Sequence, residues 1–238
     1  MDTTLLTLLG MSLAAGIAMP IGAIAARFEH IQAQWLESEF RHGVIAFGGG
    51  ALLSAVALIL VPEGMAEVSS STAATCLLLG GLLLMGLERW LDKHKTSAGQ
   101  MLAMMSDFIP ESIALGAMIA MGGEGVALLV LLMALQNLPE GFNAYRELKE
   151  HSNLSAQTII TLFSIMALSG PLAAWMGYTL LADQATTLAV IMLVAAGGIL
   201  YSVFSDIAPQ AKLENHRLPP MGAVLGFTVG VVGQMLIQ

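Results

Sequence analysis

Long apolar stretches alternate with short polar ones along the whole chain. A helix needs about 20 mainly apolar residues to cross the hydrocarbon core of a bilayer, which is roughly 30 Å thick. Eight stretches reach that length, at residues 3–26, 43–62, 70–89, 98–121, 124–146, 152–182, 184–205 and 218–238. This pattern predicts an all-α, polytopic membrane protein in which residues 1–238 form a single transmembrane domain, because the loops are too short to hold a soluble one.

The composition agrees with a chain surrounded by lipid. Of its residues, 56% are hydrophobic and only 11% are charged, whereas a soluble domain carries about 25% charged residues. The net charge of -8 provides no basic surface for nucleic acid. The single cysteine, Cys76, excludes an internal disulfide framework and a cysteine-rich metal cluster. We therefore expect the lipid bilayer, and no nucleic acid, as a partner.

The basic residues predict the topology, since all nine fall in four alternate loops. These residues are Arg27 and Arg41, then Arg89, Lys93 and Lys95, then Arg146 and Lys149, then Lys212 and Arg217. Basic loops stay in the cytoplasm, so both termini are expected outside a cytoplasmic (inner) cell membrane. An acidic outer rim is expected from Asp2, Glu63, Glu67, Glu124 and Asp183.

Short phrases recur in spans that cross in opposite directions. The three pairs are IPES at 109–112 with LPEG at 138–141, MPIGA at 19–23 with GPLAA at 170–174, and VPE at 61–63 with APQ at 208–210. They predict an inverted repeat in which helices 1–3 correspond to helices 6–8 and helix 4 to helix 5, a common plan of secondary transporters. The alternative is chance recurrence of glycine and proline, which are frequent in membrane helices.

Three acidic residues, Asp107, Glu111 and Glu140, lie deep inside predicted spans. Each costs roughly 2.5–3.5 kcal/mol at the centre of a membrane helix, so protonation or a bound cation must balance the charge. Asp107 and Glu111 are four residues apart, as are Gln136 and Glu140, so each pair shares a helix face. Two such faces, opposed, would bring four oxygen donors to one point. The alternative is a set of protonated or hydrogen-bonded structural acids.

Other polar residues are weaker candidates for the same site. Pro110 and Pro139 each lack a backbone N–H and so free a carbonyl at this depth. The side chains that we expect to join or support the site are those of Ser106, Asn137 and Asn143. Near span ends, Glu63 is a candidate for recruiting cations and Asp206 for releasing them. A solvated helix-end acid is the alternative for both.

The doubled Pro-Glu phrase resembles the ZIP (Zrt/Irt-like protein) metal transporters, whose fourth and fifth helices carry His-Asn-x-Pro-Glu-Gly-type motifs. The eight spans, the phrases at 19–23 and 61–63 and the segment 201–209 also resemble this family, so the resemblance covers nearly the whole chain. It implies that the metal ligands are Asp107, Glu111, Gln136 and Glu140, with Asn137 beside them.

The chain departs from the family pattern at several positions. Asp107 and Gln136 stand where the motifs have histidine, and Phe108 stands where the first motif has asparagine. Phe108 cannot bind a metal, and the sixth span has no acidic residue near 169–171, so a mononuclear site is expected. The family's His-rich loop between helices 3 and 4 is reduced here to residues 92–95.

The ligand types and the resemblance together suggest the substrate. Carboxylate and carbonyl oxygens suit hard ions such as Mn²⁺, whereas imidazole suits Zn²⁺. The resemblance implies zinc first, with iron and manganese as further substrates, and cadmium is another candidate. We expect a transport domain for divalent metal uptake, without a resident cofactor or enzymatic activity, and with a homodimer as a candidate assembly. The alternative is an intramembrane hydrolase that uses embedded acids such as Asp107 and Asp206.

Overall fold

The computed structural model describes residues 3–29, 34–94, 99–122, 125–213 and 217–237, and within them all regular structure is helical. The elements are α1 (Thr3–Phe28), α2 (Gln34–Ala55), η1 (Val56–Leu60), α3 (Val61–Ala66), α4 (Ser70–His94), α5 (Gly99–Met121), α6 (Val126–His151), α7 (Ala156–Leu180), α8 (Ala185–Ser202), η2 (Val203–Ile207), α9 (Ala208–Ala211) and α10 (Leu218–Ile237). The segments η1 and η2 are short π-helices that continue the preceding α-helices.

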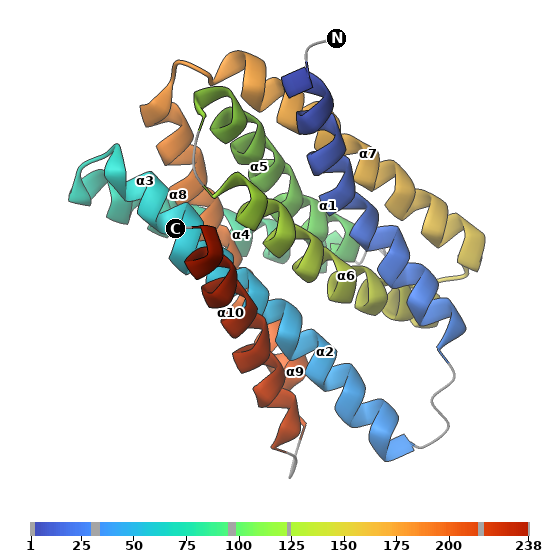
Figure 1. The fold of residues 1–238 in the computed structure, drawn as a ribbon. Coiled ribbons are helices and arrows are strands. Elements are labelled where there is room, and N and C mark those ends of the chain that lie inside the picture. Colours follow the sequence, from blue (N-terminus) through green and yellow to red (C-terminus); the bar gives the residue numbers. More distant parts are fainter. Residues whose placement is uncertain (1–2, 30–33, 95–98, 123–124, 214–216, 238) are drawn as a thin grey trace.

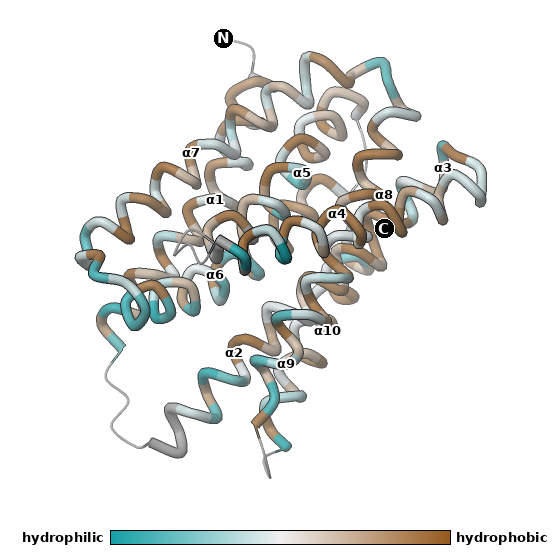
Figure 2. The backbone as a smooth tube through the Cα atoms, turned by 180° about the vertical axis from the view of Figure 1, so that it is seen from behind, coloured by the Kyte–Doolittle hydropathy of each residue, from teal (hydrophilic) through white to brown (hydrophobic). Residues whose placement is uncertain are grey.

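Eight helical stretches of the described residues are long and apolar enough to cross a membrane. The sequence prediction of an all-helical, multi-pass membrane protein is therefore confirmed. Figure 2 shows hydrophobic colour along the helices and hydrophilic colour gathered mainly at their ends. Two spans are composite, since α2, η1 and α3 form the second and α8, η2 and α9 form the seventh. These two spans run on to Ala66 and Ala211, beyond the ends that the sequence predicted.

The π-helices explain why the composite spans are longer than expected. In η1 the N–H of Val61 bonds to the carbonyl of Val56, five residues earlier, and η2 ends with the equivalent bond. Pro62 and Pro209 follow the two π-helices at the same spacing. Proline has no N–H for the helical ladder, and a π turn rearranges the local hydrogen bonds. The helix therefore passes through the proline instead of ending before it.

The spans form two groups of four. Helices α1, α5, α6 and α7 pack together as the first group, and α2–α3, α4, α8–α9 and α10 pack together as the second. In Figure 1 the first group lies toward the right and the second toward the left and bottom. Between the groups, α2 packs along α6 and α8 packs along α5. The helices with the doubled Pro-Glu phrase therefore face the second group.

Glycines set the closest helix contacts inside each group. A Cβ atom on Gly22 of α1 would strike the carbonyl oxygen of Leu138 of α6, and one on Gly141 of α6 would strike the carbonyl oxygen of Met19 of α1. Each helix thus contributes one glycine to a reciprocal clasp. Such close approach is how helices associate in lipid, where van der Waals packing replaces the hydrophobic effect.

The same reciprocal clasp joins three other helix pairs. Its glycines are Gly116 and Gly177 between α5 and α7, Gly80 and Gly197 between α4 and α8, and Gly50 and Gly226 between α2 and α10. Each of the four pairs joins helices of the same group, two pairs in the first group and two in the second. Across the boundary between groups, Gly48 of α2 instead faces side-chain atoms of Pro139. The helices are therefore clasped backbone to backbone within groups, while side chains fill the space between groups.

Polar side chains interrupt the buried core at this boundary. The buried polar residues of the described chain are Ser12, Ser54, Asp107, Glu111, Ser112, Gln136 and Asn137. Five of the seven lie on α5 or α6. The core is otherwise formed by aliphatic, methionine and phenylalanine side chains from both groups. A polar layer at this depth is costly in lipid and marks the place where function is expected.

Candidate functional site

Helices α5 and α6 supply the deepest candidate residues. They are consecutive and joined by a short turn, so they run antiparallel. Both continue as single helices through Pro110 and Pro139. Because the directions are opposed, residues at similar distances from the connecting turn lie level with each other. This places Glu111 beside Gln136.

Glu111 and Gln136 form the innermost level of the site. The Gln136 amide donates a hydrogen bond to the Glu111 carboxyl group, with 2.7 Å between Nε2 and Oε2. The two side chains are 0% and 1% exposed. Glu111 Oε1 and Gln136 Oε1 have no hydrogen-bond partner among the described residues. Buried oxygens normally have one, so this pair keeps acceptor capacity for a proton or a cation.

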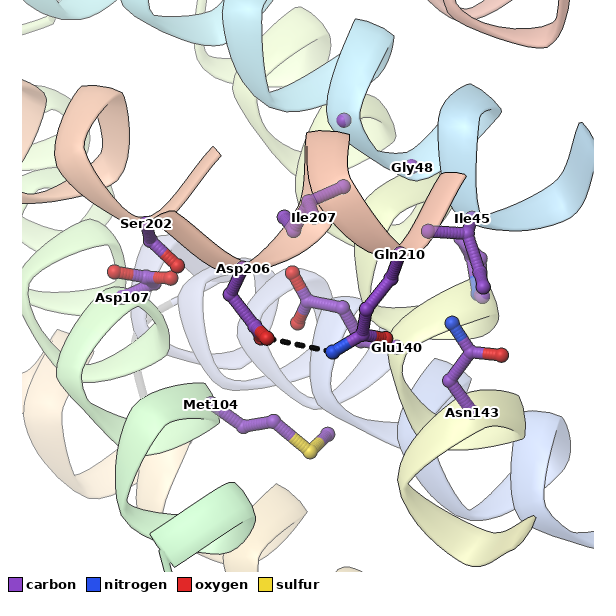
Figure 3. A pocket seen from close by; sticks show the side chains of 12 residues that line it. Ile45, Gly48, Met104, Asp107, Glu140, Asn143, Ser202, Asp206, Ile207 and Gln210 are labelled. Atoms are coloured by element: carbon purple, nitrogen blue, oxygen red, sulfur yellow. Dashed lines mark hydrogen bonds between the residues drawn. The ribbon is translucent and has the colours of Figure 1, made fainter. Parts of the chain in front are cut away.

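A cavity of about 40 Å³ lies next to this pair, between the two helix groups. Its polar lining consists of Asp107 of α5, Glu140 and Asn143 of α6, and Ser202, Asp206 and Gln210 of the seventh span. Figure 3 shows these side chains around one space, with Ile45 and Gly48 of α2 beside it. A single water needs about 10–15 Å³. The cavity therefore has room for one ion that keeps a few waters.

The electrostatics of the cavity are acidic. Asp107, Glu111 and Asp206 all lie close enough to repel a charge on Glu140, and none of the described residues that line the cavity is a lysine or arginine. Arg146, six residues beyond Glu140 on α6, instead pairs with Glu29, which directly follows α1. A cation is the natural counterpart of such a cluster, because like-charged carboxylates cannot all remain ionised close together without one.

The predicted ligands are divided between two levels. Glu111 and Gln136 form one, while Asp107 and Glu140 line the cavity with Asp206. Within the described ranges, no three or more His, Cys, Asp or Glu side chains are arranged to hold one ion directly. The single point of convergence expected from the spacing is thus not reached in this structure.

Asn137, expected beside the metal ligands, instead holds two helices together. Its amide donates to the carbonyl oxygen of Ala15 in α1, with 2.9 Å between Nδ2 and O. Phe108 occupies the equivalent place in α5, and its ring lies against Gly16 of α1 and Gly170 of α7. Both positions thus pack on α1, away from the cavity. The arrangement agrees with a single ion position.

The weaker candidates fall into two sets. Asn143 and Asp206 line the cavity, and Asn143 Oδ1 has no hydrogen-bond partner in the described part of the chain. Ser106 donates to the carbonyl of Leu102 in its own helix, at 2.8 Å, and does not line the cavity. Glu63 lies exposed on α3, far along the chain from the cavity's second-span residues.

Sequence reasoning missed two features on the seventh span. Gln210 donates to Asp206, with 2.6 Å between Nε2 and Oδ1, and orients that carboxylate toward the cavity. The signal was the four-residue spacing between the two, which puts them on one helix face. Tyr201 donates to Glu88 of α4, and the charge of Glu88 also acts on Asp206. The signal there was an acidic residue inside the third apolar stretch.

The boundary between the groups is apolar beyond Glu111, toward α3. We call this region the apolar plug; it comprises Ile59, Leu60, Ala114, Leu115, Met118, Leu129, Leu132 and Met133, none more than 4% exposed. The cavity lies on the other side of Glu111, toward α9. The site is therefore sealed by hydrocarbon at one end and lined by polar groups at the other.

The predicted acidic rim is only partly visible. Glu63, Glu67 and Asp183 are exposed at helix ends or in a turn, as solvated residues are. Asp2 and Glu124 lie outside the described residues. None of the described rim residues lines the cavity.

Comparison with known proteins adds no assignment to this geometry. No protein-family model matches the chain, and no curated protein matches it.

Proposed function

We propose that this protein is a divalent metal transporter of the kind that its resemblance to the ZIP family implies. The observation that carries the proposal is the carboxylate-lined cavity at membrane depth, between two helix groups, whose described lining residues include no cationic side chain. Intramembrane acids of this kind mark ion pathways. A metal ion supplies the positive charge that the protein lacks there.

The chemistry of the lining favours a hard or borderline divalent ion. Asp107, Glu140 and Asp206 offer carboxylates, Asn143 offers an unpartnered amide oxygen, and Met104 adds a thioether. Oxygen donors suit Mn²⁺ and Fe²⁺, and carboxylates also bind Zn²⁺. Zinc, iron, manganese and cadmium are the substrates that we propose, with zinc first because of the family resemblance.

The direction of transport follows from two asymmetries. The loops that carry the basic residues include those on the α9 side, and such loops face the cytoplasm. The cavity lies toward α9 and the apolar plug toward α3. In this orientation both termini would be outside, and the apolar plug would close the outer end of the site. Metal would enter when the plug opens and would leave toward Asp206.

An inverted repeat would supply the movement. The π-helices begin 147 residues apart (203 minus 56), and so do Pro62 and Pro209. Gly50 and Gly197 have this same separation, and both take part in reciprocal clasps. The helix contacts fit the same repeat. The pair α1–α6 corresponds to the pair α7–α5, and the pair α2–α10 corresponds to the pair α8–α4. Repeats of this kind let one helix group move against the other around a fixed site.

A transport assay tests the proposal. The purified protein is placed in liposomes that contain a zinc-sensitive dye, and Zn²⁺ is added outside. We expect zinc influx that falls at least about tenfold in Glu140→Gln and in Asp107→Asn, because each removes one charged ligand of the substrate. Glu150→Gln is the matched control, since Glu150 lies on the same helix but is exposed and outside the cavity. Equal influx in all four proteins, or none with Zn²⁺, Fe²⁺, Mn²⁺ or Cd²⁺, would contradict the proposal.

One observation favours a second function, an intramembrane aspartyl hydrolase. Asp107 and Asp206 line the same cavity, as the two acids of such an enzyme must. This reading leaves Glu140 without a role at the centre of the lining. Cleavage of a membrane-spanning peptide that persists in Glu140→Gln and stops in Asp107→Asn would select the hydrolase.

A further inference from the structure

A second, larger pocket opens beside the cavity. It has a volume of about 490 Å³ and lies between α4, α5 and α8. Its walls include Leu83, Leu84 and Leu87 of α4 and Val190 and Val194 of α8. We call it the lateral groove. Leu83 at its edge is 64% exposed, so in a membrane the groove is open to lipid.

Asp107 belongs to both the cavity and the lateral groove. Its side chain is 7% exposed, and no donor among the described residues forms a hydrogen bond or ion pair with it. A buried carboxylate without a partner normally signals a missing one. Here the missing partner can arrive from two directions, through the polar cavity or through the apolar groove.

We propose that the lateral groove binds an amphipathic cation, such as a long-chain amine or a quaternary alkylammonium. The cationic head lies at Asp107, and the alkyl chain lies along Leu83, Leu84 and Val194. The charge of the head complements the unpartnered carboxylate, and the chain replaces the lipid tails that would otherwise fill the groove. A neutral or anionic lipid would fill the same walls but leave the carboxylate unbalanced.

A second groove shows why the carboxylate matters. It has a volume of about 760 Å³ and lies between α1, α2, α6 and α10, with Leu138 and Leu225 in its walls. Its only carboxylate among the described lining residues is Glu29, which pairs with Arg146. This groove is at least as large and as apolar, but its charge is already balanced. It is therefore the natural control, expected to take alkyl chains without preferring a cation.

If the proposed transport function holds, the bound cation is also an inhibitor. It would occupy Asp107 and lie between α5 of the first group and α4 and α8 of the second. Both effects would oppose metal passage. The binding itself does not depend on transport, so the two proposals can fail separately.

Fluorescence quenching tests the binding directly. The three native tryptophans are replaced by phenylalanine, and one tryptophan is introduced, as Leu84→Trp in the lateral groove or as Leu225→Trp in the other. The proteins are placed in nanodiscs and titrated with dodecyltrimethylammonium brominated near the chain end, or with the equally brominated dodecanol. In Leu84→Trp we expect the cation to quench at about tenfold lower membrane concentration than the alcohol. In Leu225→Trp the two should quench alike.

Two further variants complete the design. Asp107→Asn, added to Leu84→Trp, should abolish the preference for the cation while leaving quenching by the alcohol unchanged. Gly198→Leu fills the groove from α8, where an added Cβ has only ordinary contacts at 3.7 and 3.9 Å, and should weaken quenching by both compounds. Equal quenching by cation and alcohol in Leu84→Trp, or a cation preference that survives Asp107→Asn, would overturn the proposal.

Discussion

The two ends of the boundary between the helix groups use the same backbone but different side chains. After Pro139-Glu140, helix α6 continues with Asn143 and Glu147, whereas after Pro110-Glu111 the equivalent positions of α5 are Ala114 and Met118. The two π-helices differ in the same way, since Ile59 stands in η1 where η2 has Asp206. The prolines and the π-helices are thus present at both ends, and the side chains alone decide which end takes up water. An apolar constriction excludes ions by staying dry.

The largest contrast should appear in the reactivity of paired cysteines. In a Cys76→Ala background, Asn143→Cys and Ala114→Cys place a thiol at equivalent positions of the polar end and the apolar plug. We expect a water-soluble thiol reagent to modify the first about a thousandfold faster, because the second requires an opening that costs roughly 4 kcal/mol. Labelling is followed by mass spectrometry, with exposed Gln157→Cys as the control for full reactivity. Similar rates at both positions would remove the contrast.

A carboxylate placed in the apolar plug should make the two ends of the boundary more alike. Ile59→Asp copies Asp206 into η1, where the side chain is 2% exposed. We expect a loss of about 3 kcal/mol in unfolding free energy, together with faster labelling of Ala114→Cys. Ile59→Val, which keeps the site apolar, should cost about 1 kcal/mol and leave labelling slow. Thermal unfolding in detergent measures the first effect.

Removing the acid from the polar end should impair passage more than folding. Asp206→Asn keeps the shape and the contact with Gln210 but removes one charge from the cavity. We expect zinc influx into liposomes to fall about tenfold, with a change in unfolding midpoint no larger than that of Glu150→Gln. An unchanged influx would show that the carboxylate is not on the path of the metal.

The smallest effect should come from the partner of that acid. Gln210→Ala removes the hydrogen bond to Asp206, which contributes about 1 kcal/mol. We expect zinc influx to fall about fivefold and cysteine labelling at position 143 to stay fast. Gln210→Glu adds a carboxylate instead and should raise the apparent affinity for zinc. Influx at a series of zinc concentrations distinguishes the two.

Much of this arrangement follows from the sequence, for physical reasons. Apolar length alone determines the eight spans, because lipid accepts few other structures. The four-residue spacing places Asp107 with Glu111 and Gln136 with Glu140 on single faces. Spacing within one helix does not determine, however, which residues of two neighbouring helices lie at the same depth in the membrane. The antiparallel arrangement therefore divides the predicted ligands into two levels.

Other features depend on neighbours that the sequence does not name. Asn137 turned out to bond with Ala15, which requires knowing that α1 packs against α6. The second and seventh spans were predicted to end at residues 62 and 205, but π-helices carry them on to Ala66 and Ala211. The lateral groove arises because α8 packs beside α4 and α5, which precede it by more than 60 residues. Contacts of this kind are set by tertiary packing rather than by local pattern.

The glycine clasps have a mechanical consequence. Two reciprocal clasps lock backbones together inside each group, whereas Gly48 and Gly233 meet side chains of the other group. Each helix group is therefore expected to move as a rigid body, with an interface between the groups that is formed by side chains. A methyl group added within a group, as in Gly141→Ala, should clash with the backbone of the neighbouring helix and distort that group. The same methyl group added at Gly48 would press on the ring of Pro139 and not on a backbone. A substitution between the groups should therefore be tolerated better than one within a group.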